Sequence, residues 1–314
     1  MVGGEALGGP IMKKILTTPC LMRSAQEFSA QEVKRVGKDQ KSVCILQSES
    51  AAACSDDEML IGSCDATTCL IVFVVCNYGV SVLHLDDGTC GDEDYLQKGI
   101  RFVDSEADLY MVGSYAEPSY HSKNVLSAAL SFFEQCRATF NLVLAFVDAV
   151  NTQEKVVNGV AIPAPRITGA CMNPVTRKIF PADFVDHGPK YVERRMRCML
   201  SAPNSDVYDF ERRRFRFEPW PFSLSSHAVQ RYRKYVELDD ASLLRCTSTS
   251  PEVEKDEYAD DMREMFQTLI DNPSSDKLFG PRLEVAMFEW RNDGWAIVAS
   301  GEMESSSAVI MQAA

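Results

Sequence analysis

The clearest pattern along the chain is a pair of apolar runs at residues 69–76 and 80–85. Both runs are short and rich in Val, Leu and Ile, which is typical of buried β-strands. The residues between them are Asn77-Tyr78-Gly79, and an Asn and a Gly in so short a connection favour a tight turn. The pattern therefore predicts a β-hairpin made of two buried strands.

Helical periodicity is clear at residues 124–137, where apolar side chains recur at intervals of three and four residues. Shorter apolar stretches between turn-forming residues predict the other elements. We expect strands at 42–47, 59–61, 109–112, 142–147, 167–172, 177–180, 212–217, 286–290 and 295–299, and helices at 24–38, at 192–200 and from 248–251 to about 272. Because the predicted strands follow one another as hairpins, with helices between them, we predict an α+β fold. Its sheets would be mixed and antiparallel, with flanking helices in a layered sandwich.

The domain organisation follows from the same pattern of elements. No internal repeat or long low-complexity linker interrupts the pattern, so we expect a single domain over residues 15–300. Residues 1–14 and 301–314 have little pattern and are rich in Gly, Ser or Ala, so we expect them to be flexible.

Composition narrows the class of protein. The net charge of −13 argues against broad nucleic-acid binding, which needs a basic surface. The longest strongly apolar run, residues 69–76, is too short to cross a bilayer, and no signal peptide is recognisable at the start. The eleven cysteines are an odd number without a Cys-x-x-Cys pair, which predicts reduced thiols and no structural metal site. We expect a monomer in a reducing compartment, the cytoplasm with or without the nucleus.

Candidate chemistry is densest at residues 61–69, where a polar loop that begins with Gly leads into the first strand of the hairpin. Cys69 ends this loop, and a turn centred near Tyr78 makes His84 its diagonal neighbour on the partner strand. An imidazole beside a thiol can stabilise the thiolate and then protonate a leaving group. Ser63 is placed to orient His84, and loop N–H groups could form an oxyanion hole. A Cys at a strand start is more often a core residue, so the pattern alone leaves both interpretations open.

The loop also carries a family resemblance. Gly62-Ser63-Cys64-Asp65-Ala66-Thr67-Thr68-Cys69 resembles the motif of the eukaryotic protein N-terminal asparagine amidohydrolases. The resemblance continues in the family's order over about residues 15–300, at 83–86, 112–115, 183–189, 220–222 and 248–251. A more distant resemblance connects Ser63, Cys69 and His84 with the loop Thr or Ser, the Cys and the His of bacterial chemoreceptor glutamine deamidases and necrotizing-factor toxins.

The resemblance implies a catalytic assignment and a reaction. Cys69 would be the nucleophile, His84 the acid and base, and Ser63 the residue that orients His84. The reaction would convert an N-terminal Asn of a protein or peptide to Asp with release of ammonia, without a metal or an organic cofactor. The family commonly has an acidic residue where this chain has Cys64, which leaves open a disulfide between Cys64 and Cys69 as a switch.

Recognition of a free N-terminus requires a carboxylate, because desolvating the α-ammonium is costly without an opposite charge. Asp65 and Asp86 are the nearest candidates in the sequence, and Glu49 is the third. Three other histidines, His121, His187 and His227, lack metal-ligand spacing and are interpreted as surface or loop residues.

Two other functions stay open. One is a deamidase that acts on internal Gln or Asn side chains, as in the bacterial relatives. The other is a non-catalytic module that binds protein N-termini. For the amidohydrolase, the resemblance also implies a pathway, in which the new N-terminal Asp leads through arginylation to ubiquitin-dependent degradation.

Overall fold

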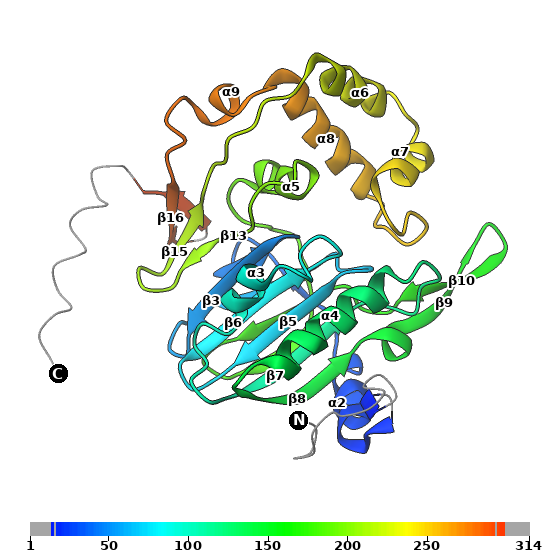
Figure 1. The fold of residues 1–314 in the computed structure, drawn as a ribbon, viewed down its shortest axis with the longest axis vertical. Coiled ribbons are helices and arrows are strands. Elements are labelled where there is room, and N and C mark those ends of the chain that lie inside the picture. Colours follow the sequence, from blue (N-terminus) through cyan, green and yellow to red (C-terminus); the bar gives the residue numbers. More distant parts are fainter. Residues whose placement is uncertain (1–13, 16, 293, 299–314) are drawn as a thin grey trace, which may run out of the picture.

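A six-stranded sheet forms the centre of the molecule (Figure 1) in a computed structural model that describes residues 14–298 except 16 and 293. Its strand order is β13-β3-β6-β5-β7-β8. In that order the strands are Ser205–Asp206, Glu49–Cys54, Gly79–Leu85, Leu70–Val75, Glu106–Gly113 and Thr139–Phe146. The predicted hairpin is the β5–β6 pair at its centre, in the register Leu70↔Leu85. This register places Cys69 opposite Asp86 and makes His84 its diagonal neighbour, as predicted.

A second sheet of five strands carries the first half of the candidate loop. Its order is β1-β12-β11-β4-β2, and the strands in that order are Lys34–Val36, Lys178–Phe184, Ala170–Asn173, Leu60–Ser63 and Ser42–Ile45. The loop from β4 to β5 therefore passes from one sheet to the other. Cys69 lies where the chain enters the six-stranded sheet.

The two faces of the six-stranded sheet belong to different cores. Leu70, Val72 and Leu83 point to the face covered by α3 (Glu93–Gly99) and α4 (His121–Gln135), which cross the front of the sheet in Figure 1. Ile71 and Val82 point to the opposite face, into a core shared with the five-stranded sheet. Strand side chains alternate, so Cys69 and His84 lie on this second face. Helix α2 (Pro19–Ser29) packs against β8.

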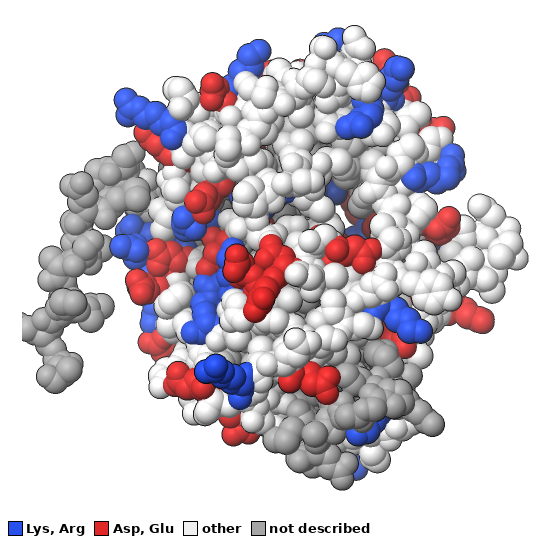
Figure 2. All heavy atoms as spheres, in the orientation of Figure 1, with Lys and Arg blue, Asp and Glu red and all other residues white. Residues whose placement is uncertain are grey.

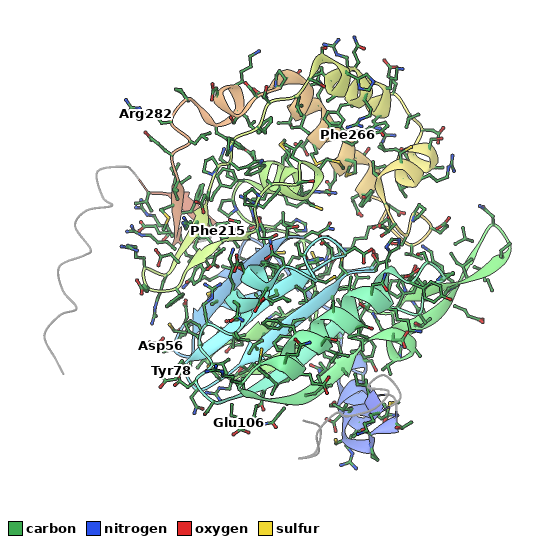
Figure 3. All side chains as sticks on the ribbon, viewed as in Figure 1. Asp56, Tyr78, Glu106, Phe215, Phe266 and Arg282 are labelled. Carbon is green, nitrogen blue, oxygen red and sulfur yellow. The ribbon has the colours of Figure 1, made fainter. Side chains whose placement is uncertain are left out.

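The rest of the chain builds a helical layer and a small sheet beyond one end of the six-stranded sheet (Figure 1). Its helices are α5 (Tyr191–Met199), α6 (Ser226–Val236), α7 (Asp240–Thr247), α8 (Tyr258–Asp271) and α9 (Ser275–Phe279). The small sheet has the order β14-β15-β16-β17, with strands Tyr208–Asp209, Arg214–Phe217, Ala286–Arg291 and Gly294–Ile297. Phe266 of α8 stacks on Tyr232 of α6 with ring centroids 4.9 Å apart, which joins the two helices (Figure 3). A separate hairpin consists of β9 (Thr152–Val157) and β10 (Val160–Pro165).

The hairpin turn marks the far end of the central sheet. Tyr78 lies at this turn, and Figure 3 shows it at the end of the sheet away from the helical layer. Because β5 runs from Leu70 to the turn, Cys69 lies at the opposite end, beside the helical layer. The fold thus places the candidate loop between two sheets and a set of helices.

The predicted α+β class is confirmed, whereas two predicted helices are wrong in extent. The helix predicted at 24–38 begins at Pro19 and ends at Ser29, and Lys34–Val36 is instead a strand that pairs in parallel with β12. The helix predicted to begin at 248–251 begins at Tyr258, and residues 248–251 form a loop. Strand β3 and the β9–β10 hairpin were not predicted, since Ala-rich and charged segments carry a weak strand pattern.

The predicted flexible end 301–314 and residues 1–13 lie outside the described residues, and the single domain over 15–300 stays a prediction. Within the described part of the chain, the structure contains no helix of the length and apolar character needed to cross a membrane.

Candidate active site

The loop from Ser63 to Cys69 is held on both sides. Asp65 adopts a left-handed conformation with φ of 59°, which turns the chain away from β4. The N–H of Ala66 then donates to Thr168 O at 2.8 Å, and the Ala66 side chain is fully buried. The loop is therefore a fixed connection whose last residue, Cys69, remains partly exposed.

Ser63 determines which nitrogen of His84 carries the proton. The Ser63 hydroxyl lies 2.6 Å from the carbonyl oxygen of Ile45 and 2.7 Å from Nδ1 of His84. A carbonyl oxygen can only accept, so the single hydroxyl proton goes to Ile45. Ser63 Oγ must then accept from Nδ1–H of His84, which leaves the lone pair on Nε2. This tautomer is the one that can act as a base through Nε2.

The second nitrogen of His84 is buried without a hydrogen-bond partner among the described residues. Burial lowers the pKa of His84, although the nearby carboxylates of Asp86, Asp65 and Glu49 oppose this shift. The imidazole is therefore neutral at pH 7. A buried, unpaired Nε2 on the same sheet face as the Cys69 thiol is the arrangement expected of a general base.

The Cys69 thiol is held in its neutral form. Burial raises the pKa of Cys69 well above its usual value, and the negative charge of Asp86 raises it further. A thiol with a raised pKa needs a base to become a nucleophile at neutral pH, and His84 is the imidazole that shares its sheet face. The resting pair is therefore a neutral thiol and a neutral imidazole.

Backbone contacts hold the carbonyl side of Cys69 and leave its amide side open. Gly113, at the end of β7, has φ of 114°, and a Cβ at this position would lie 2.6 Å from Cys69 O. The N–H of Ser114 donates to the same oxygen at 2.7 Å. In the described part of the chain, the N–H groups of Thr68 and Cys69 donate to no other group. These two N–H groups are therefore free to donate to an oxyanion.

Cys69 opens into a cavity of about 1380 Å³, which is large enough for the end of a peptide. The wall is formed by the candidate loop, the end of β6, α5 and the start of α8. Figure 2 shows this face of the molecule hollowed between α5 and the start of α8, with acidic atoms in and beside the hollow.

Asp86 is the carboxylate closest to Cys69 in the sheet register, and it lines the cavity. It is 7% exposed, and its Oδ1 accepts from the N–H and the hydroxyl of Thr89 at 2.8 Å and 3.0 Å. Its Oδ2 has only a long contact of 3.5 Å with the hydroxyl of Ser48 and one of 3.9 Å with the Cys198 thiol. Among the described residues, no cationic side chain forms an ion pair with it.

The other two predicted carboxylates already have cationic partners. Asp65 lines the cavity, but its Oδ1 lies 2.8 Å from Nζ of Lys255 and its Oδ2 lies 3.8 Å from Nε2 of His187. Burial raises the pKa of Asp65, but these partners outweigh burial and hold the pKa well below its usual value. Glu49 is fully buried in a bidentate pair with Arg194 and does not line the cavity.

One part of the site was not anticipated from residue patterns alone. The loop at 248–251 packs on the candidate loop, where the hydroxyls of Ser250 and Thr67 lie 2.9 Å apart and those of Thr249 and Thr68 lie 3.0 Å apart. Glu254 accepts from Ser250 at 3.3 Å, and burial raises the pKa of its carboxyl. The sequence signal was present as one of the blocks of family resemblance, but it was interpreted as a helix cap.

The cysteines form no disulfide, so the structure contains no Cys64–Cys69 bond. The Cys64 thiol instead contacts Asp65 Oδ2 at 3.2 Å and His187 Nε2 at 3.5 Å. Three of the described side chains come together as potential metal ligands, namely those of Cys44, Cys64 and His187.

Comparison with known proteins adds a second line of information about the chain. A family model described as protein N-terminal asparagine amidohydrolase matches residues 31–296. The chain is similar to proteins of that name from Mus musculus (26% identity over 296 residues, 90% of this chain and 92% of the relative) and Sus scrofa (25% over 298 residues, 90% and 92%). It is also similar to one from Arabidopsis thaliana, with 25% identity over 332 residues, 93% of this chain and 94% of the relative.

Proposed function

Because the chain belongs to the protein N-terminal asparagine amidohydrolase family, we propose that it is an amide hydrolase that converts the N-terminal Asn of a protein to Asp and releases ammonia. The structural observation that supports the proposal is that Cys69 and His84 both line the cavity, while the buried Ser63 is hydrogen-bonded to His84 behind them. The thiol and the unpaired Nε2 share a sheet face, and Asp86 lies beside them without a cation.

The reaction proceeds through a thioester. Nε2 of His84 takes the proton from the Cys69 thiol, and the thiolate attacks the side-chain amide carbon of the substrate Asn. The N–H groups of Thr68 and Cys69 stabilise the oxyanion that forms. The imidazolium then protonates the leaving nitrogen, ammonia departs, and a thioester remains. His84 next deprotonates a water molecule, which attacks the thioester and regenerates the thiol with Asp as the product.

Asp86 provides the recognition of a free N-terminus. A buried carboxylate without a cation is unfavourable, and the α-ammonium of the substrate supplies the missing charge. Asp65 and Glu49 are weaker candidates, since Lys255 and Arg194 already balance their charges. We therefore assign the ammonium contact to Asp86, with Asp65 at the rim of the same cavity.

Selectivity for Asn over Gln follows from the two contacts that fix the substrate, one at Asp86 and one at Cys69. The α-ammonium at Asp86 and the amide carbon at Cys69 set the length of side chain that fits between them. Burial of one extra methylene discriminates by roughly 10–200-fold, and a misplaced amide carbon also loses the attack geometry.

We also infer the biological setting from the family. The enzyme acts as a monomer in the cytoplasm, with or without the nucleus, and its product enters ubiquitin-dependent degradation as an N-degron. Its partners are proteins and peptides with a free N-terminal Asn, and neither nucleic acid nor membrane takes part.

The test is ammonia release from peptides that begin with Asn or Gln, each with a free or an acetylated α-amine. We expect release from the free Asn peptide only, and none from Cys69→Ala. Cys246→Ala, at an exposed cysteine of α7, is the control for loss of a thiol. Turnover of acetylated peptides would instead identify an internal deamidase. Binding of free peptides without turnover would identify a non-catalytic module.

A further inference from the structure

Three potential metal ligands converge behind the candidate loop. The Sγ atoms of Cys44 and Cys64 and a ring nitrogen of His187 all lie within 4.8 Å of one another. Both cysteines are buried and His187 is half-buried, with its ring stacked on Tyr191 at a centroid distance of 4.2 Å. Two thiols and an imidazole are ligands that zinc prefers in proteins.

The cluster is assembled by tertiary structure. Cys44 lies in β2, Cys64 directly follows β4, and His187 lies in the loop after β12. In the parallel β2–β4 pair, Cys44 is opposite Gly62, so Cys64 is its diagonal neighbour on the same face of the sheet. Since the ligands come from three distant segments, no ligand spacing could have revealed them in the sequence.

The distances between the ligand atoms fit a tetrahedral ion. Zinc binds sulfur at about 2.3 Å and imidazole nitrogen at about 2.0 Å, so tetrahedral angles separate the two ligand atoms by about 3.5 Å. Cys64 Sγ and His187 Nε2 are 3.5 Å apart. An ion could therefore be accommodated between them with little movement of either side chain.

Asp65 is not one of the three converging residues, but it lies beside two of them and is the side chain available as a fourth ligand. Its Oδ2 lies 3.2 Å from Cys64 Sγ and 3.8 Å from His187 Nε2, so this oxygen faces the cluster. Its other oxygen is held by Lys255 at 2.8 Å. Zinc with two thiolates, one carboxylate and a neutral imidazole has a net charge of −1, and the Lys255 ammonium, which also pairs with Asp183, lies beside it.

We propose that Cys44, Cys64, His187 and Asp65 form a zinc site at the base of the candidate loop. This site replaces our sequence-based expectation of no metal. Cys64, Asp65 and His187 line the large cavity, which provides a route of entry for the ion. The ion ties the first residues of the loop to β2 and to the loop after β12. It takes no part in the hydrolysis, because the reacting groups Cys69 and His84 are not among its ligands.

The test measures metal binding by the full-length Cys69→Ala variant, which removes the catalytic thiol as a competing ligand. The protein is reduced, treated with a chelator and titrated with Co²⁺. We expect one equivalent to bind with the visible absorption of a tetrahedral site and a thiolate charge-transfer band, and Zn²⁺ to displace it. Cys64→Ser and His187→Gln should each weaken binding by at least about 100-fold, since even loss of an outer-shell partner weakens such sites by about 10–100-fold.

Cys171→Ser is the matched control, because Cys171 is buried in the same small core as Cys44 and Cys64 but is not part of the cluster. It should bind one equivalent like the parent. Thermal unfolding gives a second measurement, in which Zn²⁺ should raise the Tm of the parent and of Cys171→Ser but not that of the ligand variants.

The competing explanation is an ion pair of protonated His187 with Asp65, beside two ordinary thiols. It predicts no stoichiometric Co²⁺ binding, and that result would overturn the proposal. Tetrahedral binding that persists in both Cys64→Ser and His187→Gln would overturn it as well, because the ion would then be held elsewhere. Neither result depends on amidase activity, so the zinc site and the proposed reaction are tested separately.

Discussion

Ser63 and His84 are joined by a hydrogen bond of 2.7 Å whose direction is set by a third group. Because the Ser63 proton is already donated to Ile45 O, Ser63 accepts from Nδ1 of His84. The bond crosses from the five-stranded sheet to the six-stranded sheet. It therefore couples the packing of the two sheets to the tautomer of His84.

Removal of the Ser63 hydroxyl should disturb the orientation of His84 but leave the imidazole in place. In Ser63→Ala, His84 can rotate or change tautomer, so we expect kcat to fall by about 10²-fold with little change in KM. Ser81→Ala is the control, because Ser81 is a buried serine on the opposite face of the same strand as His84. Steady-state kinetics with a free Asn peptide measures both. A kcat equal to that of Ser81→Ala would show that Ser63 does not orient the base.

The pH profile should be bell-shaped. His84 must be neutral to accept the thiol proton, and burial lowers its pKa, so the acidic limb of kcat/KM should lie below pH 6.5. The substrate must keep its α-ammonium for Asp86, and the pKa of a peptide α-amine is about 7.7–8.0, which sets the alkaline limb. In the pH profile of kcat, the alkaline limb should lie at higher pH than in the profile of kcat/KM, because Asp86 stabilises the ammonium of the bound substrate. An alkaline limb at the same pH in both profiles would contradict this role of Asp86.

Asp86→Asn should change binding and thiol reactivity in opposite directions. Loss of the carboxylate removes the partner of the α-ammonium, so kcat/KM for a free Asn peptide should fall by about 10²-fold or more. The negative charge of Asp86 also raises the pKa of Cys69, so its loss should lower that pKa and speed alkylation by iodoacetamide at pH 7. Asp87→Asn is the control, since Asp87 is exposed and pairs with His121. A fall in both activity and alkylation would indicate structural damage instead.

Gly113→Ala should damage the site by steric contact. A Cβ at this position would lie 2.6 Å from Cys69 O, and the positive φ adds strain, so we expect about 1–3 kcal/mol of destabilisation and reduced kcat. Gly159→Ala separates the two effects, because Gly159 also has a positive φ, of 79°, but a Cβ there would meet no described atom within 4 Å. It should lose stability and keep its kcat. Equal kcat values for the two variants, measured on folded protein, would exclude the steric effect on Cys69.

Arg194 and Glu49 form a fully buried ion pair that should dominate the stability of this region. Arg194→Met leaves the Glu49 carboxylate buried and unpaired, so we expect unfolding to be easier by about 3–5 kcal/mol in urea denaturation. The exposed pair of Arg212 and Asp209 provides the comparison, and Arg212→Met should change stability by less than about 1 kcal/mol. A similar small effect for Arg194→Met would mean that water reaches Glu49.

The hydrophobic pattern by itself predicted the central hairpin and the diagonal placement of His84 on the same face as Cys69, because a tight turn and alternating side chains are local properties. The structure fixed the exact register, with Leu70 opposite Leu85. The family resemblance identified six blocks of sequence, of which the candidate loop is the first. Only the tertiary structure decided which of the candidate carboxylates pair with a cation. Arg194 lies far from Glu49 in the chain, and their pairing left Asp86 as the buried carboxylate without a cation.

The errors have the same origin. Lys34–Val36 was predicted as helix from local periodicity, but long-range pairing with β12 made it a strand. The loop at 248–251 has good helix-capping residues, yet its hydroxyls bond to the candidate loop instead of starting α8. Cys44, Cys64 and His187 had no recognisable spacing, since three separate segments of the chain bring them together. Local sequence sets local backbone structure, whereas partners distant in sequence depend on how the sheets pack.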